Sequence, residues 1–357
     1  MDTLLNREFV DQKKQPIFLG EGLGIQMYHD PKYPVFADLF RKQWEFVWFP
    51  EEIELKKDRN DFKDDAIMTP NEKFIFTSNL KYQTMMDSVI CRGVPVLQKF
   101  VSNNEVEACL NTWAAFEQIH SYAYTYIIQN VYNDPSDVFH NILTDNEIMR
   151  RADVAVKEYD VLNKIAQGRS KKDVKKQIYM TIVSINILEA IRFYVSFVCA
   201  FAFAENKKMV GNADIVKQIK RDEALHLYNT QEILKILHGV KEEGFIETAN
   251  ECQDMAVKMF ETAAHEEKEW ASYLFKDGSI IGLSETALHH YIDWLCMSRR
   301  KAIGLPYDSV GKNPLGWTDA WMNSGAVQVA PQEHEITSYK KGASKNDLYD
   351  MDLGGLL

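Results

Sequence analysis

Paired cysteines are lacking in this 357-residue sequence. The five cysteines lie far apart, at positions 91, 109, 199, 252 and 296, and none forms a Cys-x-x-Cys pair. The spacing argues against a thiolate zinc site and a disulfide scaffold, and favours a reducing compartment. The first eight residues also lack the basic and then apolar pattern of a signal peptide. We therefore expect a cytoplasmic protein.

Proline is sparse outside the two ends of the chain, and no strict alternation of apolar and polar residues persists. Apolar residues recur instead at helical spacing, and Thr69 and Asp134 each precede a proline, as residues that cap a helix often do. We expect an all-α protein of long helices joined by short turns. The predicted helices are 33–47, 70–100, 104–130, 134–168, 171–206, 212–238, 243–274 and 284–303.

Long basic runs are also lacking, and the net charge is −11. This balance argues against nucleic acid as a partner. The apolar run at residues 178–204 is long enough to be considered as a membrane span. Because Asn186, Glu189 and Arg192 near its middle would be costly in lipid, we expect a buried helix of a large soluble bundle and no membrane association.

Two Glu-x-x-His segments are present, Glu117 to His120 and Glu223 to His226. Residues three apart share one face of a helix, so each segment directs a carboxylate and an imidazole the same way. A chain of this length and ordinary composition is expected to contain about one such segment by chance, so the pattern alone is weak evidence for a metal site. They gain weight because a lone acid on an apolar helix precedes each one by 30 to 34 residues.

The combined set matches a known arrangement of metal ligands, with Asp87 in place of one glutamate. Ferritin-like dimetal proteins direct one Glu from each of two helices, and a Glu-x-x-His from each of two others, into the core of a bundle. We therefore expect a ferritin-like helical bundle with a dimetal site in its core and additional flanking helices. Oxygen-rich ligands with few imidazoles suit iron or manganese. The expected cofactor is two metal ions per chain, with iron favoured and manganese or a mixed pair left open. The candidate ligands are Asp87, Glu117, His120, Glu189, Glu223 and His226.

Tyr124 follows His120 by four residues and projects from the same helical face. A phenol beside a metal pair that activates O2 is a candidate for one-electron oxidation. The alternative is that Tyr124 only packs, as aromatic residues at helical spacing usually do, and Tyr122 lies close by. Phe193 and Phe197 would supply a dry wall around the phenol.

The last segment differs in composition from the rest. Residues 323–357 are rich in Gly, Ser, Lys, Asn and Asp, and end in Leu-Gly-Gly-Leu-Leu. We expect one domain at 1–322 and a flexible tail at 323–357. An apolar tip on such a tail suggests a docking peptide, although chain ends without a function are also common.

Several of these segments resemble the small (β) subunit of class I ribonucleotide reductase, closest to its class Ia-like branch. The resemblance runs from about residue 16 to the C-terminus. It rests on the Glu117-Gln-Ile-His-Ser-Tyr-Ala-Tyr run, on Asn79 to Gln83 leading to Asp87, and on the segments 188–194, 221–226 and 329–333.

The resemblance implies that the six acids and imidazoles bind the metals and that Tyr124 is a stable radical formed with O2. It also implies that Trp48 passes an electron from the surface toward the metals through Asp222 and His120. Asp222 has a second rationale, since a ligating histidine usually donates its free N–H to a carboxylate.

For the rest of the chain, the resemblance implies a homodimer whose C-terminal peptide docks on a large (α) subunit. Tyr339 would relay oxidation to that partner, assisted by Glu333. The reaction would be the reduction of ribonucleoside diphosphates to deoxyribonucleotides, with substrate and effectors bound by the large subunit.

Two other functions remain to be weighed. A related dimetal oxidase would act on a bound small molecule or on its own side chains, and would need neither Trp48, Tyr339 nor a docking tail. A ferritin-like storage or structural bundle would normally have subunits of about half this length, and fold-level likeness alone supports it weakly.

Overall fold

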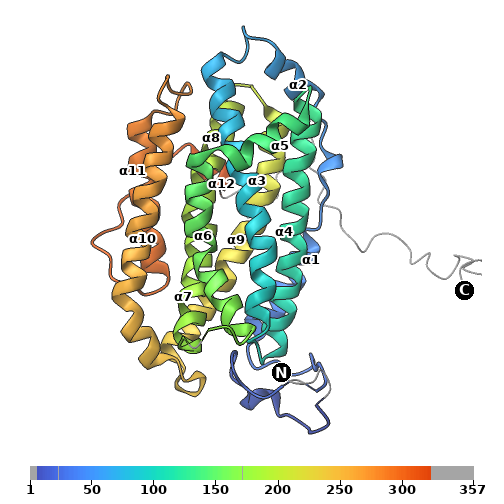
Figure 1. The fold of residues 1–357 in the computed structure, drawn as a ribbon, viewed down its shortest axis with the longest axis vertical. Helices are drawn as coiled ribbons and strands as arrows, with labels where there is room; N and C mark the ends of the chain where they lie inside the picture. The colour runs from blue at the N-terminus through green and yellow to red at the C-terminus, as the bar shows by residue number, and fades with distance from the viewer. Residues whose placement is uncertain (1–5, 23, 171, 323–357) are drawn as a thin grey trace, which may run out of the picture.

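The computed structural model describes residues 6–22, 24–170 and 172–322, and within these ranges it contains helices and two isolated β-bridges but no strand. The all-α prediction is confirmed. Figure 1 shows an elongated bundle of long, nearly parallel and antiparallel helices. The α-helices are α1 (Pro34–Glu45), α2 (Lys56–Lys63), α3 (Pro70–Gln98), α4 (Asn104–Val131), α5 (Pro135–Thr144), α6 (Asn146–Ala166), α7 (Val174–Ile187), α8 (Phe193–Glu205), α9 (Val210–Gly239), α10 (Ile246–Leu274), α11 (Glu285–Ala302) and α12 (Thr318–Met322).

Two of the predicted helices are interrupted. The expected helix 134–168 is two helices, α5 and α6, because Asp145 between them is extended and its side chain accepts hydrogen bonds from the Glu147 and Ile148 amides. The expected helix 171–206 contains one π-helical turn, η3 (Leu188–Arg192), between α7 and α8. The short helices α2 and α12 were not predicted, since so few residues carry little periodic signal.

The centre of the bundle consists of α3, α4, α9 and the continuous α7–η3–α8 segment. α3 packs against α4, α6 and α8, while α9 packs against α4, α7 and α8. α1 covers α4, and α10 and α11 form a pair on the other flank (Figure 1). This arrangement matches the expected ferritin-like bundle with flanking helices.

Capping residues set where the central helices begin. Thr69 and Glu72 form a reciprocal capping box at the start of α3, where each side chain accepts a hydrogen bond from the other residue's amide. The Asn103 side chain accepts from the Val106 amide at 3.1 Å at the start of α4. Because a helix has a regular repeat, these starting points also determine which later residues face the core.

The apolar stretch Val174–Glu205 is long and apolar enough to cross a membrane by composition alone. However, 94% of its most apolar window is buried inside the protein. Its Glu189 and Arg192 are also buried within the bundle. The stretch is therefore a core helix of the bundle, as predicted.

Gly93 allows α3 and α6 to approach closely. A Cβ atom at this position would lie 2.4 Å from Cε1 of Tyr159 on α6, which is too short for a real contact. We expect Gly93→Ala to lower the free energy of unfolding by about 1–3 kcal/mol through overpacking. Gly239→Ala is the matched control, because no atom lies within 4 Å of its Cβ position. Denaturant unfolding measures both, and equal effects would contradict this account of the α3–α6 contact.

Candidate metal centre

All six candidate ligands lie together in the core of the bundle. Asp87 comes from α3, Glu117 and His120 from α4, Glu189 from the π-helical turn, and Glu223 and His226 from α9. Each of the six is fully buried. Four separate segments of the chain therefore converge on one small volume, as the spacing in the sequence indicates.

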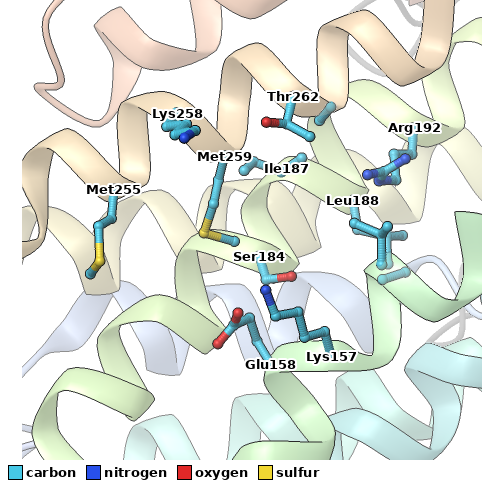
Figure 2. Close-up of a pocket in the computed structure, with 13 residues that line it drawn as sticks. Lys157, Glu158, Ser184, Ile187, Leu188, Arg192, Met255, Lys258, Met259 and Thr262 are labelled. Atoms are coloured by element: carbon cyan, nitrogen blue, oxygen red, sulfur yellow. The ribbon is translucent and has the colours of Figure 1, made fainter.

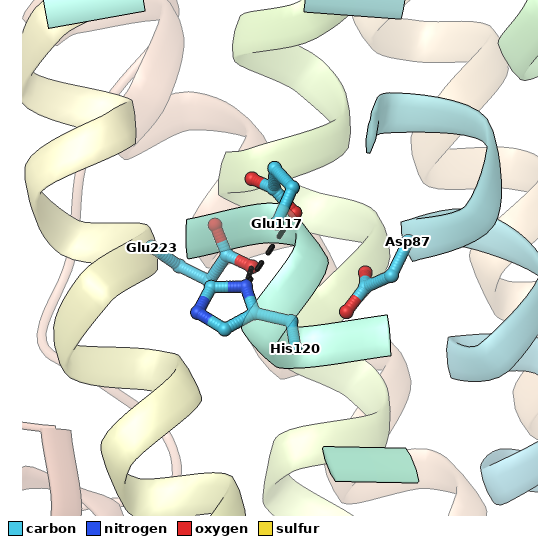
Figure 3. Close-up of side chains that lie close together, drawn as sticks. All are labelled: Asp87, Glu117, His120 and Glu223. Carbon is cyan, nitrogen blue, oxygen red and sulfur yellow. Dashed lines mark ion pairs between the residues drawn. The ribbon is translucent and has the colours of Figure 1, made fainter. Parts of the chain in front are cut away.

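The six residues form two overlapping groups of four. In each group, one potential ligand atom of every member lies within 4.8 Å of the others. Figure 3 shows the first group, with Asp87 and Glu223 on opposite sides of Glu117 and His120. The second group consists of Glu117, Glu189, Glu223 and His226. Glu117 and Glu223 belong to both groups, and each has two oxygens, so this geometry suits two ions bridged by two carboxylates.

Both imidazoles turn the same ring nitrogen toward the shared carboxylates. Nδ1 of His120 lies 3.2 Å from Oε1 of Glu223 and 3.4 Å from Oε2 of Glu117. Nδ1 of His226 lies 2.9 Å from Oε1 of Glu117 and 2.9 Å from Oε2 of Glu223. The two nitrogens thus face the carboxylate oxygens that a metal ion would also contact.

The two lone acids are the least satisfied groups of the cluster. Both side-chain oxygens of Asp87 and both of Glu189 are buried without a hydrogen-bond partner. Burying a polar group without a partner costs free energy, and an unpaired charge costs more. A divalent cation removes this cost, so the residues present fit a pair of bound metal ions.

Protonation would relieve the same cost when no metal is bound. Burial raises the pKa of Asp87 and of Glu189 well above the usual range, and the neighbouring carboxylates add to the effect. Burial would lower the pKa of His120, but Glu223 and the other facing carboxylates raise it well above its usual value. Burial opposes ionisation of Glu223, yet interactions with Glu189, His120 and His226 lower its pKa. The metal-free cluster therefore retains protons that a cation would displace.

Asp222 connects the cluster to Trp48. Nε2 of His120 lies 3.1 Å from Oδ2 of Asp222, and the Trp48 indole N–H donates to the same oxygen at 2.7 Å. The Trp48 and His120 rings are stacked at 6.5 Å between centroids. By accepting from Nε2–H, Asp222 would leave Nδ1 of His120 free to bind a metal. The structure thus places Trp48, Asp222 and His120 in one hydrogen-bonded chain.

Tyr124 and Tyr122 have opposite environments. Tyr124 is fully buried and its hydroxyl has no hydrogen-bond partner, whereas Tyr122 is 44% exposed and donates to Glu51. Burial raises the pKa of Tyr124 well above 10, and the charge of Asp87 and the other acids adds to this. Buried tyrosines normally find a partner, so the unpaired hydroxyl of Tyr124 favours more than a packing role.

Phe193 and Phe197 were predicted to form a dry wall around the Tyr124 phenol. Phe193 and Phe197 are fully or nearly fully buried, and their rings are stacked at 5.9 Å between centroids. Both follow the π-helical turn on α8, within two turns of Glu189. Their burial agrees with a dry core, and their position around Tyr124 stays a prediction.

Trp113, which was not predicted from the sequence, is also part of the site. Its indole N–H donates to Oε1 of Glu117 at 2.6 Å, and its ring stacks on His226 at 4.8 Å between centroids. Trp113 therefore orients one ligand from each of two helices. Its position four residues before Glu117, on the same helical face, was the available signal.

Two of the candidate residues, Tyr339 and Glu333, lie outside the described residues, as does the whole predicted tail 323–357. Their relay and docking roles, and the division of the chain at residue 322, stay predictions.

We expect Mn²⁺ binding to the metal-free protein to tighten from about pH 6 to about pH 8 and to release protons. The reason is that Asp87, Glu189 and His120 all have raised pKa values, so protons occupy the ligands and compete with the metal. Titration calorimetry in buffers of different ionisation enthalpy measures both effects. A pH-independent affinity with no proton release would contradict this description of the cluster.

Comparison with known proteins agrees with the geometry. The family model described as "Ribonucleotide reductase, small chain" matches residues 26–310. Ribonucleoside-diphosphate reductase subunit beta of Haemophilus influenzae is 45% identical, with 98% of each chain covered. Ribonucleoside-diphosphate reductase 1 subunit beta of Escherichia coli O157:H7 is 42% identical, with 96% of each covered.

Solved structures show the same fold. A ribonucleotide reductase R2 subunit from Clostridium botulinum matches with a TM-score of 0.78 and 25% identity, covering 90% of this chain and 99% of that one. The dimanganese(II)-NrdF structure from Streptococcus sanguinis matches in fold, with a TM-score of 0.64 and 17% identity over 83% of this chain and 95% of that one. With its family match and its full-length relatives, this chain belongs to the ribonucleotide reductase small-chain family.

Proposed function

We propose that the chain is the small (β) subunit of a class I ribonucleoside-diphosphate reductase, which generates and stores the radical used by a large subunit. Membership of the small-chain family supports this activity. The observation that carries it is the unpaired, fully buried hydroxyl of Tyr124 in the same dry core as six buried potential metal ligands.

In this proposal the ligands hold two metal ions. Asp87 and His120 would hold the first ion and Glu189 and His226 the second, while Glu117 and Glu223, which belong to both overlapping groups, would serve both. Iron is the favoured metal, and manganese fits the same ligands. When bound, the ions supply the capacity to oxidise Tyr124 with O2.

Tyr124 stores the oxidising equivalent. A phenol that loses an electron becomes strongly acidic. The electron would pass to the oxidised metal centre and the hydroxyl proton to a carboxylate of the cluster, of which Asp87 acts most strongly on the phenol, so that a neutral radical remains. Before oxidation, burial and the nearby carboxylates keep the phenol neutral, because they disfavour the phenolate. The absence of a hydrogen-bond partner and of solvent at the hydroxyl leaves few groups with which the radical would react.

The hydrogen-bonded chain from Trp48 through Asp222 to His120 is the proposed route out of the core. The indole can give up an electron, and Asp222 can accept the indole proton without moving. Beyond Trp48, the proposed relay passes to Tyr339, assisted by Glu333. It ends on the large (α) subunit, where ribonucleotides are reduced.

The proposed assembly is a cytoplasmic complex of a homodimer of this chain with the large subunit. The C-terminal peptide of each chain would dock on that partner. Neither nucleic acid nor a membrane has a role in this proposal, in keeping with the net charge of −11 and the burial of the apolar core helix.

Tyr124→Phe tests the site of the radical. In the metal-loaded, O2-exposed wild type we expect an organic radical signal by electron paramagnetic resonance, and we expect the variant to lose it. Tyr122→Phe is the matched control, because this exposed tyrosine lies on the same helix two residues away and points out of the core. An unchanged radical signal in Tyr124→Phe would exclude Tyr124 as its source.

Deletion of residues 335–357 separates this function from that of a dimetal oxidase. With the large subunit present, we expect the truncated chain still to form the Tyr124 radical but to lose nucleotide reduction, because the relay and the docking peptide are both removed. Radical content and deoxynucleotide formation are measured on the same sample. Retained turnover would favour an oxidase that acts without the tail.

A further inference from the structure

Glu189 is presented by an unusual piece of backbone. The π-helical turn η3, from Leu188 to Arg192, interrupts an otherwise continuous helix at this ligand. Single π-helical turns are rare and occur frequently at functional sites. Because its i→i+5 hydrogen bonds depart from the α-helical pattern, such a turn is retained where tertiary contacts favour it over a continuous α-helix. The contacts made by the turn therefore decide where the Glu189 carboxylate lies.

Arg192, the last residue of the turn, makes the strongest of these contacts. Its side chain is 4% exposed, and its two terminal nitrogens pair with two consecutive carboxylates of α10. Nη1 lies 3.2 Å from Oε1 of Glu267, while Nη2 pairs with Oε2 of Glu266. Oε1 of Glu267 also accepts a hydrogen bond from Tyr82 on α3 at 2.7 Å. The turn is thus joined to two other helices.

The segment of α10 that carries Glu266 and Glu267 is in turn contacted by a residue of α6. Arg151 donates to the Glu266 carbonyl at 3.0 Å, and its guanidinium lies 4.9 Å from the centre of the Trp270 ring. Trp270 in turn packs on Tyr82 with 4.9 Å between ring centroids. These contacts hold the segment carrying Glu266 and Glu267 in a defined position.

The turn is buried, and one side of it borders a pocket. A pocket of about 250 Å³ lies between α6, α7 and α10, and its lining includes Leu188 and Arg192 of the turn. Figure 2 shows both residues toward one end of the pocket and Met255 at the other. On the side that the pocket borders, the ion pairs of Arg192 help to hold the turn.

We propose that Arg192, clamped by Glu266 and Glu267, is a positioning residue that holds the π-helical turn so that Glu189 faces the metals. The proposal rests on the proposed dimetal centre. Arg192 belongs to neither group of ligands and acts through Glu189, three residues earlier in the chain. Glu189 belongs to the second group alone. Loss of the clamp therefore weakens the binding of the second ion and leaves the binding of the first ion unchanged.

The test is a Mn²⁺ titration of the metal-free, full-length protein, followed by electron paramagnetic resonance and calorimetry. In Glu267→Gln we expect the second ion to bind about 10- to 100-fold more weakly while the first is unchanged, as for other groups that orient a ligand. The spectrum should change from that of a coupled pair to that of an isolated ion. Arg192→Lys keeps the charge but loses the contact with two carboxylates at once. Its affinity for the second ion should therefore lie between those of the wild type and Glu267→Gln.

Glu269→Gln is the matched control. Glu269 lies two residues further along α10 and pairs with Arg150 of α6 on the surface at 2.8 Å, with both side chains well exposed. The Glu269→Gln variant should bind both ions with the affinity of the wild type. Glu266→Gln serves as a second clamp variant if Glu267→Gln does not fold, because the Glu266 side chain is 13% exposed and its loss is milder.

Two results would overturn the clamp. One is a folded clamp variant that binds both ions with wild-type affinity, and the other is an equal loss at both sites, which would indicate a general structural role. A wild-type protein that binds fewer than two ions would instead overturn the dimetal centre itself. The two proposals therefore fail in different ways.

Discussion

Four carboxylates buried together in a helical core are the constraint on which the rest of the structure depends. Asp87, Glu117, Glu189 and Glu223 are all fully buried and face only two imidazoles of the cluster. Ionised, they would bring four negative charges into a medium where charge is expensive. Two divalent cations bring four positive charges and restore neutrality. The metal-free protein instead retains protons on part of the set, as the raised pKa values of Asp87 and Glu189 indicate.

The same dryness explains the neighbouring residues. A core that excludes water would protect the proposed radical at Tyr124, and it strengthens each hydrogen bond made inside it. Trp113, Asp222 and Arg192 each orient one part of the cluster through such a contact, on Glu117, His120 and the π-helical turn respectively. The proposed dimetal centre therefore depends on neighbouring side chains as well as on its six candidate ligands, because these neighbours keep the ligands in place.

Most of the site could be predicted because the helical repeat converts sequence spacing into geometry. The Glu-x-x-His pairs, the lone acids and Tyr124 lie where that repeat places them. The break at Asp145 and the π-helical turn at Glu189 could not be predicted this way, because a single residue that changes the local backbone leaves the apolar pattern on both sides intact. From the sequence, Arg192 served only as a charge that argues against a membrane span. Its role in the site could not be predicted, because its partners on α10 lie more than 70 residues away in the chain.

In the proposed centre, Glu117 and Glu223 would each serve both metal ions. The most direct measurement is the anomalous diffraction of crystals of the Mn²⁺-loaded protein. We predict two peaks per chain about 3.5–4 Å apart, as in other two-metal sites. Asp87 and His120 should contact one peak, Glu189 and His226 the other, and Glu117 and Glu223 both. A single peak, or two peaks without a shared carboxylate, would contradict the account.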